Sequence, residues 1–278
     1  MQQSGARRHK PDNRCVLLPH DELGAGTPVV LLHAGVVDRR MWGEHLAAIA
    51  GADHRVIAMD LPGFGEAAVA QEQAPWADVL ETMDALDVDR AALVGNSFGG
   101  AVALRVAVIS PERVIALALV SAPAPEFEPS TELQAAWDRE ESALERGDIE
   151  AAVDAVVAAW TLPDAPATLR HRVATMQRRA FEVQAAAGAS NEVPDPIDEP
   201  AVALAKLTIP ALVAVGQFDM SDFHAAAEAL AQLLPSARHT VIAGAGHLAP
   251  LEQPDAFRAL LLDFLRPSGA EHPPSEPA

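Results

Sequence analysis

One serine lies in a short segment framed by glycines that is typical of an enzyme nucleophile. The pattern G-x-S-x-G, in which a serine occupies a tight turn between a strand and a helix, is matched by Gly95-Asn96-Ser97-Phe98-Gly99. Glycine suits both flanks because the strand and helix backbones approach each other there. The pattern is common by chance, so its meaning depends on the rest of the chain. A serine hydroxyl is a weak nucleophile, and Ser97 therefore requires a general base and an acid to orient that base.

Two later segments supply these groups. Asp219 follows the apolar run 211–215, and His247 follows the run 239–243 and a turn that contains Gly244 and Gly246. Functional side chains gather at the carboxyl ends of strands in open α/β sheets, so we expect the serine, the carboxylate and the imidazole to meet there. The chain order Ser, Asp, His is also the order that accompanies a G-x-S-x-G turn.

Each partner has an ordinary structural explanation when it is taken alone. A histidine after a glycine turn is commonly a surface residue, and an aspartate after a strand commonly caps a helix. Asp222 fits the capping role ahead of Phe223 better than Asp219 does. Three such residues in this order, each at a strand end, favour a triad in which Ser97 is the nucleophile, His247 the base and Asp219 the acid.

The turn after the apolar run 29–32 is the candidate for the first half of an oxyanion hole. It reads His33-Ala34-Gly35-Val36, and small residues would let its backbone approach a ligand. We expect the backbone N–H of Gly35, with Val36 as the alternative, to act together with the N–H of Phe98. The other interpretation is an ordinary turn in which His33 bonds locally.

The elements that would position these residues alternate along most of the chain. Near-continuous apolar strands between amphipathic helices indicate a doubly wound, mostly parallel α/β sheet covered on both faces. Strands are predicted at 29–32, 55–59, 91–94, 114–120, 211–215 and 239–243, with an edge strand at 15–18, and helices at 41–50, 76–86, 100–110, 223–234 and 254–265.

The alternation stops between 122 and 200, where three helical patterns and no strand are predicted. We interpret this stretch as a helical cap inserted into a core formed by 13–121 and 201–267. A disordered leader at 1–12 and a disordered tail at 268–278 are expected to flank the core. Trp137 and Trp160 fall on the predicted cap helices, where helix packing is the expected role and contact with substrate is the alternative.

Composition excludes several classes of function. The chain has 278 residues, 50% of them hydrophobic, which is enough for a sizeable core, and its net charge of −19 argues against nucleic acid and anionic membrane surfaces. Cys15 is the only cysteine, so a reducing cytoplasm is expected. Neither a secretory signal nor an apolar run of about 20 residues is found, so no membrane association is expected. The lack of metal-ligand spacings and phosphate loops predicts no metal and no cofactor.

These segments together resemble the α/β-hydrolase superfamily across roughly 16–266. The resemblance rests on Leu31-Leu32-His33-Ala34-Gly35, Asp60-Leu61-Pro62-Gly63-Phe64-Gly65, Gly95-Asn96-Ser97-Phe98-Gly99-Gly100, Val215-Gly216-Gln217-Phe218-Asp219 and Gly244-Ala245-Gly246-His247. It implies the α/β-hydrolase fold and the triad given above, with oxyanion donors at Gly35 and Phe98. The usual His-Gly pair is replaced here by His33-Ala34. The subgroup is similar to 3-oxoadipate enol-lactonases, small carboxylesterases and meta-cleavage hydrolases.

Some members of the superfamily are excluded by single residues. Haloalkane dehalogenases and epoxide hydrolases carry aspartate at the position of Ser97, and the chain contains no tyrosine of the kind epoxide hydrolases use. The His-Gly-Gly-Pro-Gly segment of proline iminopeptidases is also missing. The expected function is therefore hydrolysis of a small carboxylic ester or lactone. The alternatives are C–C bond hydrolysis of a vinylogous diketone and, in another class, non-catalytic binding of a small ligand.

Overall fold

A seven-stranded sheet forms the centre of the computed structural model, which describes residues 17–126, 128–188 and 190–266. The strand order is β1-β3-β2-β5-β6-β8-β9, with β1 antiparallel to β3 and all other neighbours parallel. The strands are β1 (His20–Gly24), β2 (Thr27–Leu32), β3 (His54–Met59), β5 (Ala91–Asn96), β6 (Val114–Val120), β8 (Ala211–Gly216) and β9 (Ala237–Ile242). The doubly wound, mostly parallel sheet that the sequence predicts is confirmed.

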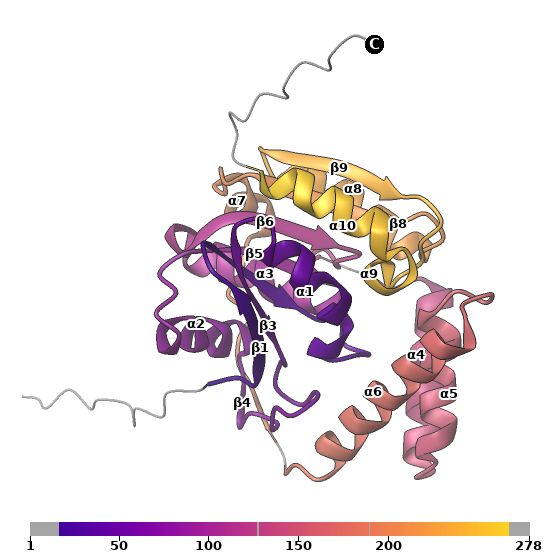
Figure 1. The fold of residues 1–278 in the computed structure, drawn as a ribbon. Helices are drawn as coiled ribbons and strands as arrows, with labels where there is room; N and C mark the ends of the chain where they lie inside the picture. The colour runs from indigo at the N-terminus through magenta and orange to yellow at the C-terminus, as the bar shows by residue number, and fades with distance from the viewer. Residues whose placement is uncertain (1–16, 127, 189, 267–278) are drawn as a thin grey trace, which may run out of the picture.

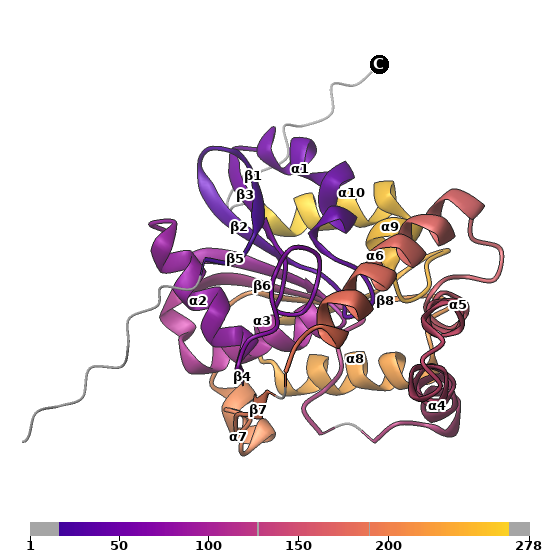
Figure 2. The ribbon, with the colours of Figure 1, turned by 90° about the horizontal axis from the view of Figure 1, so that it is seen from below.

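Helices cover both faces of this sheet, as Figures 1 and 2 show. The helices α1 (Gly43–Ala50) and α10 (Pro254–Leu265) pack on one face, and α2 (Pro75–Ala85), α3 (Phe98–Ile109) and α8 (Ser221–Leu233) pack on the other. Every residue of β5 and of β8 is therefore buried, which explains why these strands are apolar without alternation. The short elements are η1 (Arg39–Trp42), η2 (Pro111–Arg113), α7 (Pro200–Ala205) and α9 (Ala249–Glu252).

Three helices are inserted between β6 and β8 and lie beyond the carboxyl ends of the strands (Figure 1). They are α4 (Thr131–Glu145), α5 (Ile149–Trp160) and α6 (Ala167–Ala185), called the inserted helices below. Polar side chains cap two of them: Ser130 Oγ accepts from the N–H of Leu133, and Asp148 accepts from the N–H of Ala151. The three predicted helices are confirmed. The domain limits at 122 and 200 stay predictions, and the predicted leader and tail lie outside the described residues.

Short polar strands are where the sequence prediction is wrong. The edge strand is β1, not 15–18: Leu17 and Leu18 lie outside any strand, and residues 15 and 16 are not described. An edge strand needs no continuous apolar run because one of its sides faces solvent. A second sheet joins β4 (Glu72–Gln73) to β7 (Asn191–Glu192), although no strand is predicted between 122 and 200. Two residues are too few to show a strand period.

Candidate active site

The turn that carries Ser97 has the strained geometry expected of a nucleophile elbow. Ser97 has φ +52° and ψ −116°, a conformation that residues other than glycine rarely adopt, and its N–H donates to Val120 O at 2.8 Å. A Cβ atom on Gly95 would lie 2.3 Å from the carbonyl carbon of Gly99, and one on Gly99 would lie 2.2 Å from Leu32 O. Gly95 is therefore required for β5 and α3 to meet at this angle, and Gly99 is required for α3 to approach the end of β2.

Asp219 and His247 form a buried hydrogen-bonded pair. Asp219 follows β8 and His247 lies in the loop after β9, and the Nδ1 atom of His247 lies 3.0 and 3.2 Å from the two carboxylate oxygens of Asp219. The side chains of Asp219 and His247 are 1% and 4% exposed, respectively. With the Nδ1–H group donating to the carboxylate, the Nε2 atom of the imidazole is free to accept a proton. The structure thus brings together two of the three predicted triad residues.

The third predicted residue, Ser97, is linked to this pair through the residue before it. The side-chain amide of the fully buried Asn96 donates to Val120 O at 3.0 Å and to His247 O at 3.2 Å, which ties the elbow to the histidine loop. Within the described part of the chain, no hydrogen bond joins Ser97 Oγ to His247. Such a bond commonly forms only when a substrate is bound.

The predicted oxyanion turn lies against the elbow. Because β2 pairs with β5, the turn that follows β2 reaches the start of α3, and a Cβ atom on Gly35 would lie 3.4 Å from the Cβ of Phe98. Phe98 is the first residue of α3, so its N–H has no acceptor within the helix. The N–H of Val37 donates to Ala34 O at 3.2 Å and closes the turn around Gly35 and Val36.

His33 holds this turn in place and takes no proton. It is fully buried, its Nδ1–H donates to Ala34 O at 2.8 Å, and its Nε2 accepts from the N–H of Leu61 at 2.9 Å. Burial lowers the pKa of His33, so the imidazole stays neutral. The local hydrogen bond considered as an alternative for His33 therefore exists, and it connects the oxyanion turn to the loop after β3.

That loop is held by a buried carboxylate. Asp60 accepts from the N–H of Arg39 and from the N–H of Glu66, both at 2.8 Å, and forms an ion pair with the Arg39 guanidinium. These bonds fix the turn that begins at Leu61. The role of Arg39 could not be predicted from the sequence because Arg39 lies 21 positions before Asp60.

Two aromatic side chains enclose the imidazole of His247. The ring centroid of Trp160 lies 4.5 Å from that of His247, and the centroid of Phe223 lies 4.2 Å from it. Trp160 ends α5 and Phe223 belongs to the first turn of α8. The expectation that Trp160 serves helix packing alone is therefore incomplete, because its ring touches a predicted triad residue. Trp137 is 39% exposed and makes no such contact.

Asp222 does not cap its helix, contrary to the prediction. Helix α8 begins at Ser221, so Asp222 lies in its first turn, and its carboxylate accepts from the N–H of Ser130 at 2.6 Å and from the Ser130 hydroxyl at 2.7 Å. Burial opposes the charge, but these bonds hold the pKa of Asp222 below its ordinary value. Asp222 thus fastens the start of α4 to the core. Its position makes it a structural carboxylate.

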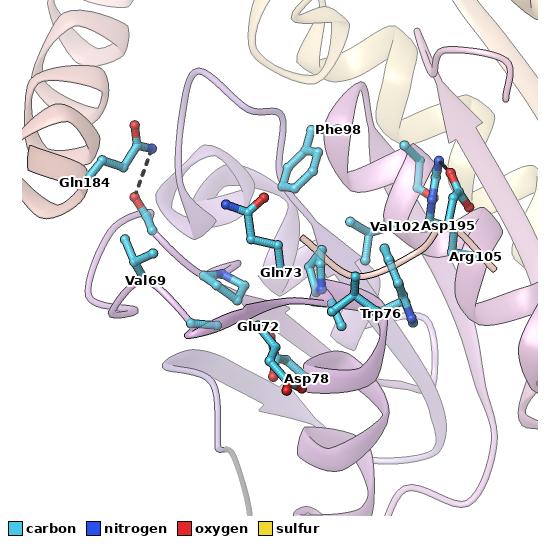
Figure 3. Close-up of a pocket in the computed structure, with 17 residues that line it drawn as sticks. Val69, Glu72, Gln73, Trp76, Asp78, Phe98, Val102, Arg105, Gln184 and Asp195 are labelled. Carbon is cyan, nitrogen blue, oxygen red and sulfur yellow. Dashed lines mark hydrogen bonds and ion pairs between the residues drawn. The ribbon is translucent and has the colours of Figure 1, made fainter. Parts of the chain in front are cut away.

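A cavity of about 540 Å³ adjoins the elbow through Phe98 (Figure 3). Val69, Trp76 and Val102 form apolar walls, and Phe98 and Asp78 lie at opposite ends. Neither Ser97 nor His247 lines this cavity, so Phe98 is the residue that it shares with the predicted site.

Two charged groups of the cavity have distinct environments. Burial, together with the nearby charge of Glu81, raises the pKa of Asp78 to about 6. Arg105 forms an ion pair with Asp195, and its guanidinium carbon lies 5.9 Å from the centroid of the Trp76 ring.

In the ranges 17–126, 128–188 and 190–266, no group of three or more His, Cys, Asp and Glu side chains is arranged to hold a metal ion. No helix in the same ranges has the length and apolarity needed to cross a membrane.

Comparison with known proteins defines the family. A family model described as alpha/beta hydrolase fold matches residues 27–254, which is most of the chain. The protein therefore belongs to the alpha/beta hydrolase family. It is 29% identical over 263 residues to a 2-hydroxymuconate semialdehyde hydrolase of Pseudomonas putida, an alignment that covers 91% of this chain and 92% of the relative. Alignments with four other curated relatives have higher identity but span only 30 to 47% of the length of those proteins.

Solved structures with the same fold include hydrolases of two kinds. A thermophilic esterase from Thermogutta terrifontis superposes with a TM-score of 0.74 at 29% identity, covering 90% of this chain and 93% of the other. An enol-lactonase from Burkholderia xenovorans LB400 gives a TM-score of 0.73 at 25% identity, covering 89% and 96%. The fold class and the family resemblance inferred from the sequence are confirmed, and they leave the substrate open.

Proposed function

We propose that this protein is a serine hydrolase that cleaves a small carboxylic ester or lactone through Ser97, His247 and Asp219. The buried bond between Asp219 and the Nδ1 atom of His247 is the observation that carries the proposal. It orients the imidazole and stabilises the cation that forms when Nε2 takes a proton. The left-handed backbone of Ser97 and the linkage of Asn96 to the histidine loop support the assignment of the nucleophile.

The mechanism follows from these positions. Ser97 Oγ attacks the substrate carbonyl carbon while His247 Nε2 removes the hydroxyl proton. The backbone N–H groups of Phe98 and of Gly35 or Val36 stabilise the developing oxyanion, a contribution of about 3 kcal/mol per donor. The imidazolium then protonates the leaving alkoxide, which leaves an acyl group on Ser97. A water molecule that loses a proton to His247 hydrolyses this ester and restores the serine.

The cavity beside Phe98 suggests where part of the substrate is held. Its walls are mainly apolar, and Phe98 joins it to the proposed oxyanion donors. An acyl or alcohol portion of a few carbon atoms would bury apolar surface there. A series of p-nitrophenyl esters from acetate to octanoate would measure how long a chain the protein accepts.

Substitution of the nucleophile tests the proposal. We expect Ser97→Ala to lower kcat for p-nitrophenyl butyrate by at least about 10⁴-fold, because no other group can form the acyl-enzyme. Wild-type protein should also react with a fluorophosphonate probe at Ser97. Activity near the wild-type value in Ser97→Ala would refute the mechanism. Ligand binding by a wild-type protein that resists the probe would favour the non-catalytic alternative.

A second candidate reaction is C–C bond hydrolysis of a vinylogous diketone. It is favoured by the relative that aligns over 92% of its own length, which is named a 2-hydroxymuconate semialdehyde hydrolase. The same three residues would serve, with water attack assisted by His247. Side-by-side values of kcat/KM for a meta-cleavage product and for p-nitrophenyl butyrate would identify the preferred bond.

A further inference from the structure

The carboxylate of Glu252 joins two parts of the molecule that meet at His247. Its Oε2 atom accepts from the N–H of Gly246 at 2.7 Å, and its Oε1 atom accepts from the N–H of Leu162 at 2.9 Å. Gly246 immediately precedes His247, whereas Leu162 follows α5 by two positions and so belongs to the exit of an inserted helix. One side chain therefore uses both oxygens to bond the histidine loop and the inserted helices at the same time.

Close packing confines this junction. A Cβ atom on Gly246 would lie 3.0 Å from Leu162 Cδ2 and 3.1 Å from Glu252 Oε2, so the three residues are already in contact. Glu252 itself belongs to the short helix α9, which lies between the core and the inserted helices in Figure 1. The carboxylate thus lies at the point where the inserted helices reach the core.

The same junction positions the aromatic ring that touches the proposed base. Trp160 lies two positions before Leu162, and its ring centroid is 4.5 Å from that of His247. The bond to Leu162 fixes the chain just after Trp160, and the bond to Gly246 fixes the chain just before His247. The carboxylate of Glu252 therefore fixes the chain next to both the Trp160 ring and the His247 ring.

We infer that Glu252 is a positioning residue that couples the inserted helices to the proposed general base by bonding Leu162 and Gly246 together. The inference rests on the proposed serine-hydrolase function, because the coupling acts on His247. In its charged form Glu252 accepts both hydrogen bonds. In its protonated form the oxygen that carries the proton is a weaker acceptor, so the hydrogen bond from one of the two N–H groups weakens.

The ionisation of Glu252 follows from its surroundings. Burial raises the pKa of this carboxyl group, the N–H groups of Leu162 and Gly246 and the charge of His247 act in the opposite direction, and the charge of Asp219 adds to the increase. The hydrogen bonds of Glu252 to Leu162 and Gly246 are therefore both formed at alkaline pH, and one of them weakens as the pH falls through this raised pKa.

Glu252→Gln is the matched substitution, because the amide has the same shape as the protonated carboxyl group and keeps one acceptor oxygen. We expect kcat for p-nitrophenyl butyrate at pH 8 to fall roughly 10- to 100-fold with little change in KM, since misplacing a catalytic group by about 1 Å has an effect of this order. The ratio of wild-type to variant kcat should shrink towards one as the pH falls. A ratio that does not vary with pH, or wild-type kcat at pH 8, would overturn the inference.

Gln253→Ala provides the control. Gln253 holds the same loop by donating to Gly244 O at 3.0 Å but does not bond the inserted helices. An equal loss of kcat in Gln253→Ala would show that loop anchoring alone matters and would refute the coupling.

Amide hydrogen exchange gives a measurement that does not depend on activity. In folded Glu252→Ala at pH 8, which lacks both acceptor oxygens, peptides containing Leu162 and Gly246 should both lose protection, whereas loss at Gly246 alone would overturn the inference. Labelling of Ser97 by a fluorophosphonate separates the two proposals. If wild type is labelled and Glu252→Gln behaves like wild type, only the coupling fails. If wild type is not labelled, the proposed function fails.

Discussion

The sheet and the inserted helices are built by different means. In the sheet, the strands that carry the predicted site are buried on both faces, and backbone atoms at Gly95, Gly99 and Leu32 approach so closely that a methyl group would not fit. The inserted helices add residues such as Val156 and Val173 to the same hydrophobic core, and separate polar bonds also join them to the sheet and its flanking elements. Examples are Ser130 to Asp222, Leu162 to Glu252, Arg172 to Glu44 and Gln184 to Gly63 O.

Because of this difference, the sheet holds the proposed catalytic residues in place, whereas the inserted helices can change without displacing them. The turn at Ser97, the Asp219–His247 pair and the proposed oxyanion turn all belong to the sheet and its loops. The inserted helices contribute Trp160 to this region and Gln184 to the cavity beside Phe98. We therefore expect substitutions in the sheet to abolish activity or folding, and substitutions in the inserted helices to modulate them.

The largest expected effect lies at the end of strand β8, at Asp219, the proposed acid. Asp219→Asn should lower kcat for p-nitrophenyl butyrate by about 10⁴-fold, because the amide favours the tautomer of His247 that lacks a free Nε2 lone pair. Asp222→Asn is the matched control, since it loosens only the start of α4. It should lower the melting temperature by a few degrees and change kcat less than about tenfold. A greater loss of kcat in Asp222→Asn would overturn the choice of acid.

The second effect compares two glycines. Gly99→Ala would place a methyl carbon 2.2 Å from Leu32 O, and displacing the backbone should lower the free energy of unfolding by about 3 kcal/mol. Gly188 follows α6, and a methyl group added there would meet no atom of the described residues within 4 Å. Gly188→Ala should therefore stay within about 0.5 kcal/mol of wild type. Urea denaturation measures both values. Equal stability of the two variants would contradict the close packing of α3 against the end of β2.

The third effect concerns the inserted helices where they touch His247. Trp160→Phe replaces the indole that lies 4.5 Å from the imidazole with a smaller ring. We expect His247, the proposed base, to shift and kcat to fall about tenfold. Trp137→Phe changes an exposed ring on α4 and should leave kcat within about twofold, because surface substitutions away from a site have little effect. Unchanged kcat in Trp160→Phe would show that the inserted helices contribute nothing to the chemistry.

The smallest effect concerns the half-buried Asp78 in the cavity. Its pKa is raised to about 6, so the folded state binds a proton more tightly than the unfolded state, and stability falls as the pH rises from about 4 to 6. Asp78→Asn removes this penalty. The variant should melt roughly 2 °C above wild type at pH 8, a shift reduced by solvent screening, and the gain should vanish near pH 4. A gain independent of pH would mean that packing, not charge, is responsible.

The sequence predicts those features whose cause is local. The strand 114–120 and the helix 254–265 are found at the predicted bounds. A continuous apolar run marks the strand and a clear helical period marks the helix, so neither depends on contacts with distant residues. Ser97, Asp219 and His247 are likewise visible as residues at the ends of such runs. Polar β1 and the two-residue strands β4 and β7 lack a period and become strands only through their partners.

The surroundings of His247 are not predictable in this way. Leu162 and Glu252 are 90 positions apart, and their bond exists only after the inserted helices meet the sheet. Trp160 is indistinguishable in sequence from a packing residue of α5, because it occupies the apolar face of that helix. Helical spacing predicts that such a residue is buried, but only the tertiary fold determines which residue it contacts.

The neighbouring positions of β6 and β8 have an evolutionary consequence. Val120 at the end of β6 pairs with Ala214 of β8, so the chain leaves and re-enters the sheet at adjacent strands. A segment inserted between two adjacent strands, such as β6 and β8, can be lengthened or replaced without shifting the register of any strand. A foreign segment would need to return an aromatic ring to His247, a backbone N–H to Glu252 and a hydrogen-bond donor to Asp222. Divergence of substrate preference can thus proceed by replacing this segment while the chemistry stays in place.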